Sequence, residues 1–578
     1  MARKFTAPGI IREETDLSEI VAAAGTSVGA TVGDADKGIA NSRVLLDNDQ
    51  KFITTFGEPN STSHTYAGYA AFEFLGESDS LYFVRATDGT EIYSTMGINA
   101  SGSTSAALIT AASSTVTVAD TDYVDGNTST NIKDYEDHSL GTDLFVVGSI
   151  GPGSYGNNIG IRVTTPAITA TVASAAYDWG SSFDDTANGT KSQKIFKIEV
   201  FTKTDAQAAS AWGGSTTPVE TFLVSREYLT DASGKQMYLE DVINGVSNYI
   251  YVKDGGDGST GATMPKYTTP VDATLSKAAI VALSGGADSS SAVDTANIKS
   301  AWSLFTDKDK VSINIAICPD VNSTVQTYVG SDVCGSRMDS IACVQAEAVT
   351  SKVPATIAEN ANYSYPNGAS YVAMYAGWDL IYDAWHDRKI YLPKCIFGAV
   401  AMARTDRVAN TWDAPAGINR GVLPSLGQNV VFTDAQIGYL YDRNINTSKR
   451  IPGSGHVLWG QKTAQKKKSA LDRINVRRLL LYIENSVEPS LLPFLFEPNT
   501  DKTRLRVFNI VDAFMRTVES GGGVTKYEVV CDTTNNTSTV IDNNQLNVDI
   551  YVQPSKTIEF IKLQTVITRS GISFEEVK

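Results

Sequence analysis

Between residues 294 and 405 the sequence alternates between short apolar runs and segments with helical spacing, and this alternation restricts the fold more than any other feature. Residues 294–305 place Ile298, Trp302 and Phe305 on one helix face, and the next run, "SINIAICPD", is typical of a buried strand. Further helices are expected in three places: 323–338, near 355, and 396–405. Strands and helices that alternate at this spacing form βαβ units. We therefore predict an α/β core around a mixed or parallel sheet.

The stretch 143–270 has a different pattern, dominated by strands such as "DLFVVGSI", "NIGIRVTT" and "KIFKIEVFT". We interpret it as a β-rich inserted domain. Residues 92–142 before it are rich in Ser, Thr and Ala and hold six acids but only one base, Lys133. They are predicted to form a small exposed insertion with some strand. The preceding part, 21–91, is expected to hold short strands of the core, among them "FITTFG".

The clearest predicted helix is "SALDRINVRRLLLYIENSV", with Ser469 as its cap. It overlaps a basic segment, 462–478, which holds seven bases and one acid in a chain of net charge −16. Arg473 and Arg477 lie four residues apart and should share a helix face. Two interpretations stay open: a solvated helix face, or a docking surface for an acidic protein partner. The residues that would form this surface are Lys466, Lys467, Lys468, Arg473 and Arg477.

Length and charge exclude several classes of protein. A chain of 578 residues with 42% apolar side chains should divide into two to four domains. The net negative charge and a pI near 4.8 argue against nucleic acid as a partner. No run of 18 apolar residues is present, and the start lacks the apolar segment of a secretory signal, so no membrane span or export is expected. Five cysteines without paired spacing are expected to be buried thiols in a reducing compartment.

Two short sequences match catalytic or cofactor-binding motifs, but neither has the secondary structure around it that the motif requires. Gly25 to Gly29 spells G-x-S-x-G around Ser27, but a strand pattern follows where the nucleophile elbow needs a helix. Gly151 to Gly156 spells G-x-G-x-x-G, and again a strand pattern follows where a dinucleotide site needs a helix. The sequence holds no phosphate-binding P-loop, its four histidines lack ligand spacing, and "DTDYVDG" lacks the glutamate of a calcium loop. We expect no enzyme activity, cofactor or metal.

Both ends of the sequence resemble strands that lack a partner. "FTAPGIIREETD" alternates after a Pro8-Gly9 break, with Ile10 and Ile11 on opposite faces. "KTIEFIKLQTVITR" (556–569) alternates as well. No hairpin turn follows the first segment to bring a partner strand beside it.

These pieces, in their order, resemble the tail sheath proteins of contractile phage tails, a family that includes the sheaths of R-type pyocins and related injection machines. The residues that carry the resemblance are "APGIIREETDLSEI", "GTSVGATVGDADKG", "FITTFGEPN", "FVVGSIGPGSYGNNIGIRV", "ALSGGAD", "WDAPAGINRGVL", "HVLWGQKT", "INVRRLLLYIENSV", "FLFEPNT" and "NQLNVDIYVQPSKTIEFIKLQ". They cover nearly the whole chain except 92–142, which looks like a variable surface insertion.

The resemblance implies a structural protein of the virion, assembled in the host cytoplasm as stacked hexameric rings around a tail tube. It implies contraction that drives the tube through the host envelope, and contacts with tube, baseplate and tail terminator proteins. It also implies that terminal arms add strands to a sheet in another subunit, with these residues in the arms: Pro8, Gly9, Ile10, Ile11, Ile558, Phe560, Ile561 and Leu563.

With the resemblance, the expected fold class is a multidomain α+β or α/β chain with an α/β core, inserted β-rich domains and extended arms. The expected parts are an N-terminal arm (1–20), a first core part (21–91), the surface insertion (92–142), the β-rich domain (143–270), the α/β core (271–460), an inner domain near the tube (461–554) and a C-terminal arm (555–578). The alternative hypothesis is a secreted β-rich adhesin or surface-layer protein that binds glycans. The composition of the sequence fits this class, but the absence of a secretory signal and the predicted α/β half do not.

Overall fold

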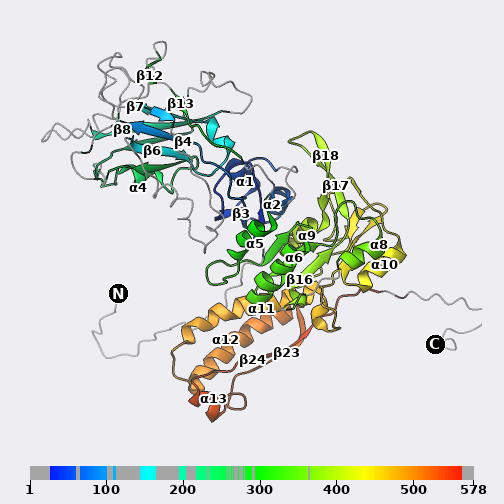
Figure 1. The fold of residues 1–578 in the computed structure, drawn as a ribbon. Coiled ribbons are helices and arrows are strands. Elements are labelled where there is room, and N and C mark those ends of the chain that lie inside the picture. Colours follow the sequence, from blue (N-terminus) through cyan, green and yellow to red (C-terminus); the bar gives the residue numbers. More distant parts are fainter. Residues whose placement is uncertain are drawn as a thin grey trace, which may run out of the picture. The chain divides into compact units, whose positions relative to one another are not determined.

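Figure 1 shows the chain as a computed structural model. The structure describes residues 27–59, 66–99, 109–111, 143–164, 194–203, 217–230, 234–256, 293–361, 365–366, 368–560 and 562, with short pieces between 258 and 288. The chain divides into two compact units. The core unit comprises residues 25–411 and 415–481, and the C-terminal unit comprises 1–24, 412–414 and 482–578.

A seven-stranded sheet forms the centre of the core unit, with the order β2-β3-β1-β14-β15-β16-β20. Its strands are β1 (Gly29–Gly33), β2 (Arg43–Leu46), β3 (Leu81–Arg85), β14 (Ile315–Cys318), β15 (Ile341–Gln345), β16 (Val372–Tyr375) and β20 (Ile445–Asn446). Neighbouring strands are parallel except β2, which runs antiparallel to β3. The prediction of a mixed sheet built from βαβ units is confirmed.

Helices cover both faces of this sheet, so its inner strands are apolar throughout. Successive residues of β14 show the arrangement: Cys318 packs into a first apolar cluster and Ile317 into a second, on the opposite face. The first cluster holds side chains of α5 (Thr295–Ser303), α6 (Ser323–Tyr328), α8 (Pro354–Asn360) and α10 (Asp434–Asp442). The second holds side chains of α1 (Asp49–Phe56), α2 (Ala67–Leu75) and α9 (Lys394–Val408).

The predicted strand "FITTFG" is wrong, because these residues form helix α1. The Asn48 side chain accepts a hydrogen bond from the Lys51 amide at 2.7 Å, which caps the helix. Phe52 and Phe56 lie one turn apart and both pack on Phe83, with ring centroids 5.2 and 4.6 Å away. A short apolar run fits either a strand or a helix. Here the cap and the Phe83 contact favour the helix.

Two further sheets of the core unit share one apolar core. The first has the order β10-β6-β4-β5 and the second β13-β7-β8-β9. Strand β4, from within the segment 92–142, pairs with β6, and both strands contribute to that core. The strands are β4 (Thr95–Asn99), β5 (Ile109–Ala111), β6 (Asp143–Ser149), β7 (Ile159–Thr164), β8 (Phe196–Thr202), β9 (Glu220–Val224), β10 (Ile250–Asp254) and β13 (Val281–Ala282). The run "STVTVAD" and Lys133 lie outside the described residues.

The glycines at 151–156 allow a close approach of two backbones. A Cβ on Gly151 would lie 1.8 Å from the carbonyl oxygen of Gly38. The Arg85 guanidinium donates to the carbonyls of Gly38 at 2.9 Å and Pro152 at 2.8 Å. A 3-10 turn, Ser154–Asn158, and then β7 follow, so the predicted strand is confirmed.

Smaller elements complete the core unit. They are α4 (Leu239–Ile243), α7 (Gly335–Arg337), β11 (Val271–Asp272), β12 (Lys277–Ala278), β17 (Trp378–Asp383), β18 (Arg388–Pro393), β19 (Gly427–Gln428), β21 (Ser448–Ile451) and β22 (Gly455–Leu458). The predicted cap Ser469 accepts from the Leu471 amide, but it caps a 3-10 turn, Ala470–Asp472. Helix α11 (Ile474–Leu491) begins beyond that turn, which corrects the predicted helix start.

The C-terminal unit consists of the end of α11, helix α12 (Asp501–Ser520), the short helix α13 (Ser538–Asp542) and the hairpin of β23 (Val524–Val530) and β24 (Asp549–Pro554). Helix α12 lies beside the hairpin (Figure 1). Its buried side chains recur every three or four residues, as in Val507, Ile510, Val511 and Phe514. Among the described residues, no helix combines the length and apolar character needed to cross a bilayer.

Candidate assembly surfaces

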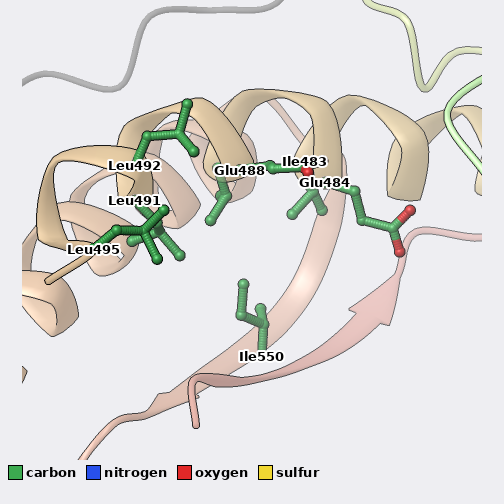
Figure 2. A pocket seen from close by; sticks show the side chains of 8 residues that line it. Ile483, Glu484, Glu488, Leu491, Leu492, Leu495 and Ile550 are labelled. Atoms are coloured by element: carbon green, nitrogen blue, oxygen red, sulfur yellow. The ribbon is translucent and has the colours of Figure 1, made fainter. Parts of the chain in front are cut away.

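An apolar groove of about 460 Å³ lies in the C-terminal unit between the end of α11 and strand β24. Figure 2 shows Leu491, Leu492 and Leu495 together at one end of it, Glu484 at the other, and Ile550 opposite the helix. The lining residues are Ile483, Glu484, Val487, Glu488, Leu491, Leu492, Leu495 and Ile550. This groove was not predicted from the sequence, although the cluster "LLPFLF" (491–496) after the helix was a signal for it.

Large apolar side chains remain exposed where the groove ends. Leu492 is 58% exposed and Leu495 is 62% exposed, and Phe496 is fully exposed. The backbone of Phe496 has φ of 70°, a left-handed conformation that is uncommon for a bulky residue. Contiguous exposed apolar residues of this kind mark interaction surfaces.

The β23–β24 hairpin has two open edges among the residues that the structure describes, because each strand pairs only with the other. Ile550 of β24 faces the groove, and the neighbouring Tyr551 is 60% exposed. A second hollow on the β23 side is lined by Leu505, Phe508, Val529 and Cys531, among others. An open strand edge next to an apolar hollow can accept an added strand together with its side chains.

The predicted arm residues are only partly within the described chain. Pro8, Gly9, Ile10, Ile11, Ile561 and Leu563 lie outside it. Ile558 and Phe560 are described, and they are 82% and 84% exposed. Residues 555–560 carry no strand assignment in this structure. Two large apolar side chains thus stand in solvent just beyond β24.

The basic segment is divided by burial. Lys466, Lys467 and Lys468 are exposed. Arg473 is partly buried and pairs with Asp472 at 3.1 Å. Arg477 is buried: it donates to the Ser370 hydroxyl at 2.8 Å.

The expectation that Arg473 and Arg477 share an exposed helix face is therefore wrong for Arg477. The guanidinium of Arg477 also stacks on the Tyr371 ring at 4.1 Å. The first turns of α11 are buried on all sides, including the polar residues Asn475 and Arg478. Helical spacing in the sequence cannot reveal a helix that is enclosed in this way.

Ser27, the residue of the G-x-S-x-G match, donates its hydroxyl hydrogen bond to Asp406 at 3.0 Å. Strand β1 follows it, as predicted, and not the helix of a nucleophile elbow. His386 contacts Asp383 at 2.8 Å, whereas His64 and His138 lie outside the described residues. Within the described parts of the chain, no group of three or more His, Cys, Asp or Glu side chains is placed to hold a metal.

All five cysteines are free and buried, as the sequence predicted. Burial raises the pKa of their thiols, to about 12 for Cys334. Glu347 is a buried acid two residues after the end of β15. Burial raises its pKa to about 8, against the opposing effects of the Gly377 amide, Lys394 and Gln345. Thiols and an acid held in their neutral forms offer no nucleophile at neutral pH.

Comparison with known proteins gives consistent matches. Residues 466–568 match the family model of the phage tail sheath C-terminal domain. The chain is 30% identical over 454 residues to the tail sheath protein of Enterobacteria phage T4, which covers 74% of this chain and 65% of the T4 protein. It is 30% identical over 322 residues to the tail sheath protein of Vibrio phage KVP40, covering 51% of this chain and 47% of that protein. The matched part of the chain thus spans about two thirds of the length of the T4 protein and about half of the length of the KVP40 protein.

A crystal structure of a sheath tail protein from Listeria innocua superposes with a TM-score of 0.53 at 11% identity. The superposition covers 92% of this chain and 96% of the other. This likeness shows a shared mixed α/β fold with several sheets. The sequence matches to tail sheath proteins confirm the resemblance that the sequence predicted.

Proposed function

Starting from this confirmed similarity to tail sheath proteins, we propose that the chain is a structural subunit of a contractile tail sheath in the virion. It assembles in the host cytoplasm as stacked hexameric rings around a tail tube and contracts to drive the tube through the host envelope. The observation that carries the proposal is the 30% identity to the T4 sheath protein over 74% of this chain. Baseplate and tail terminator proteins would contact the ends of the polymer.

The polymer is held together by chain segments that one copy lends to another. Lys556, Ile558, Phe560 and Lys562 alternate, so an extended strand carries all four on one face. The groove of a second copy offers an apolar floor with two glutamates, Glu484 and Glu488, one helical turn apart. The apolar pair with its lysines therefore complements an apolar groove whose lining includes two acids.

The free energy of such a junction is substantial. Burying Ile558 and Phe560 contributes roughly 1.5–3 kcal/mol each. Each backbone hydrogen bond to an open edge of the β23–β24 hairpin adds about 1 kcal/mol net. Repeated at every subunit, these links can hold the polymer together while the contacts between subunit bodies rearrange.

Contraction in this proposal uses energy stored in packing. The sequence holds no P-loop, and the proposal includes no catalytic role. The extended sheath is then a high-energy packing that the baseplate releases. The exposed Lys466, Lys467 and Lys468 would face an acidic surface of the tube.

Negative-stain microscopy of the purified chain tests the proposal. We expect rings or tubes of uniform width from the wild type, and none from the double variant Ile558→Asp/Phe560→Asp. The matched control is Val353→Asp, which changes a 58% exposed apolar residue at the start of α8 and should leave assembly intact. A wild-type protein that stays monomeric and binds glycans would support the adhesin hypothesis instead. Tubes from the double variant would contradict the proposed link.

A further inference from the structure

One oxygen atom at the end of helix α9 joins two distant parts of the core unit. Oδ2 of Asp406 accepts a hydrogen bond from Nη2 of Arg478 at 2.5 Å and one from the Ser27 hydroxyl at 3.0 Å. The side chains of Asp406 and Arg478 are each only 3% exposed. Arg478 also donates to the carbonyl of Met402, one turn earlier in α9, at 3.4 Å. The carboxylate is thus a shared acceptor for residues 451 positions apart in sequence.

The same end of α9 fixes Ser27 through a second route. The carbonyl of Ser27 accepts a hydrogen bond from the Ser78 hydroxyl at 2.5 Å. Glu77, the residue before Ser78, pairs with Arg404 of α9 at 2.8 Å and also with Arg407. Both the side chain and the main chain of Ser27 are therefore held by groups that α9 positions.

The two residues that bind Asp406 lie close to the two segments that are proposed to link subunits. Ser27 lies two residues before β1 begins at Gly29 and seven residues after the predicted N-terminal arm (1–20). Arg478 lies in α11, four residues before the chain passes into the C-terminal unit at Tyr482. In the proposed sheath these are the roots of the N-terminal linking arm and of the unit that receives arms from neighbours.

We propose that Asp406 is a coupling residue that ties these two roots together, so that a displacement of one is transmitted to the other. The coupling within one chain is independent of the proposed function. Only its role in transmitting force between sheath subunits rests on that function. A buried ion pair adds little net stability over an apolar pair of similar volume, whereas it fixes one geometry. Ser27 and Arg478 both donate to Oδ2 of Asp406, so the position of one depends on the position of the other. If the carboxylate moves toward Arg478, its hydrogen bond to Ser27 lengthens, and the reverse holds as well.

Hydrogen exchange of the monomeric protein tests the tie without any need for assembly. Ser27→Ala removes one bond to Asp406 and should accelerate exchange about threefold in two peptides, 27–33 and 474–481. The control Thr517→Ala removes a hydroxyl hydrogen bond to the Ala513 carbonyl within α12 and should leave both peptides unchanged. If Ser27→Ala affects only residues near 27, the two roots are not coupled and the inference is wrong.

A second variant removes the tie without leaving a buried charge unpaired. Asp406→Leu/Arg478→Met should fold, exchange about tenfold faster in both peptides, and leave the β15 peptide unchanged. Its sheath tubes should form but fragment under shear that wild-type tubes survive. Tubes as strong as the wild type, with fast exchange in both peptides, would show that the tie couples the two roots but transmits no force between subunits. Should the pair variant fail to fold, the Ser27→Ala result alone decides. Absence of any wild-type tubes would instead contradict the proposed function.

Discussion

The substitution Glu347→Gln should stabilise the core unit at neutral and higher pH. Glu347 is 3% exposed, and its Oε1 accepts the Gly377 amide at 2.6 Å, while its Oε2 has no hydrogen-bond partner within the described part of the chain. Nearby, Lys394 and Asp379 neutralise each other in a buried pair at 2.6 Å. A charge on Glu347 would therefore be left uncompensated. A glutamine keeps the shape and the acceptor without that charge.

The magnitude follows from the two pKa values of the carboxyl group. In the unfolded chain it ionises near the ordinary value of 4.5, and in the folded chain only near a pKa of about 8. Between these values the folded state keeps a proton that the unfolded state has lost, so stability falls as pH rises. At pH 7 the loss amounts to about 3 kcal/mol, because each pH unit above the ordinary pKa contributes about 1.4 kcal/mol. Below pH 4.5 the effect vanishes, and above pH 8 it is constant.

Thermal unfolding of wild type and variant from pH 4 to pH 9 measures this difference. We expect the two unfolding temperatures to coincide near pH 4 and to diverge steadily up to pH 8, with the variant higher. Glu359→Gln, which changes an exposed residue of α8, is the control and should parallel the wild type. A constant offset between variant and wild type across the whole range would refute the reasoning, because it would show no difference in proton binding between the folded and unfolded states.

Three other expectations concern other parts of the chain. Lys467→Glu/Lys468→Glu should block co-sedimentation of the sheath protein with tail tubes. It should change the unfolding temperature little, because exposed charge changes usually alter stability by less than about 0.5 kcal/mol. Lys352→Glu is the control, and normal docking of the double variant on tail tubes would show that the lysines form only a solvated face. Gly151→Ala should destabilise the core unit by about 3 kcal/mol or more in chemical denaturation, since its Cβ would overlap the Gly38 carbonyl oxygen; wild-type stability would contradict this. Deleting residues 1–17 should spare the circular dichroism spectrum and melting of the monomer yet abolish tubes, and an unfolded monomer would show that the segment pairs within its own chain.

The α/β half of the fold was predictable because its sequence carries two consistent signals. Its strands are apolar throughout, and its helices, such as α5 with Ile298 and Trp302, show helical spacing between them. Helix α1 was not predictable in the same way. Phe52 and Phe56 fit a strand as well as a helix in isolation, and only packing on Phe83 decides between them.

The candidate surfaces were predictable only in part. The resemblance implies that Ile558 and Phe560 belong to a linking arm, and the structure leaves both side chains exposed; their role in linking stays a prediction. The burial of Arg477 depends on Ser370, more than a hundred residues away, and no local pattern encodes such a contact. The groove likewise exists only once α11 and β24 meet, so its lining cannot be derived from either segment alone.

The most direct test of the proposed sheath is to locate Phe560 in the assembled polymer. A photo-reactive phenylalanine analogue at position 560 is incorporated into one isotope-labelled population, which is then assembled with unlabelled protein. Cross-linked peptides are mapped by mass spectrometry. We expect mixed-isotope cross-links to residues 483–495, in the groove of a second copy. Cross-links confined to a single isotopic chain, or mapped away from this groove, would contradict it.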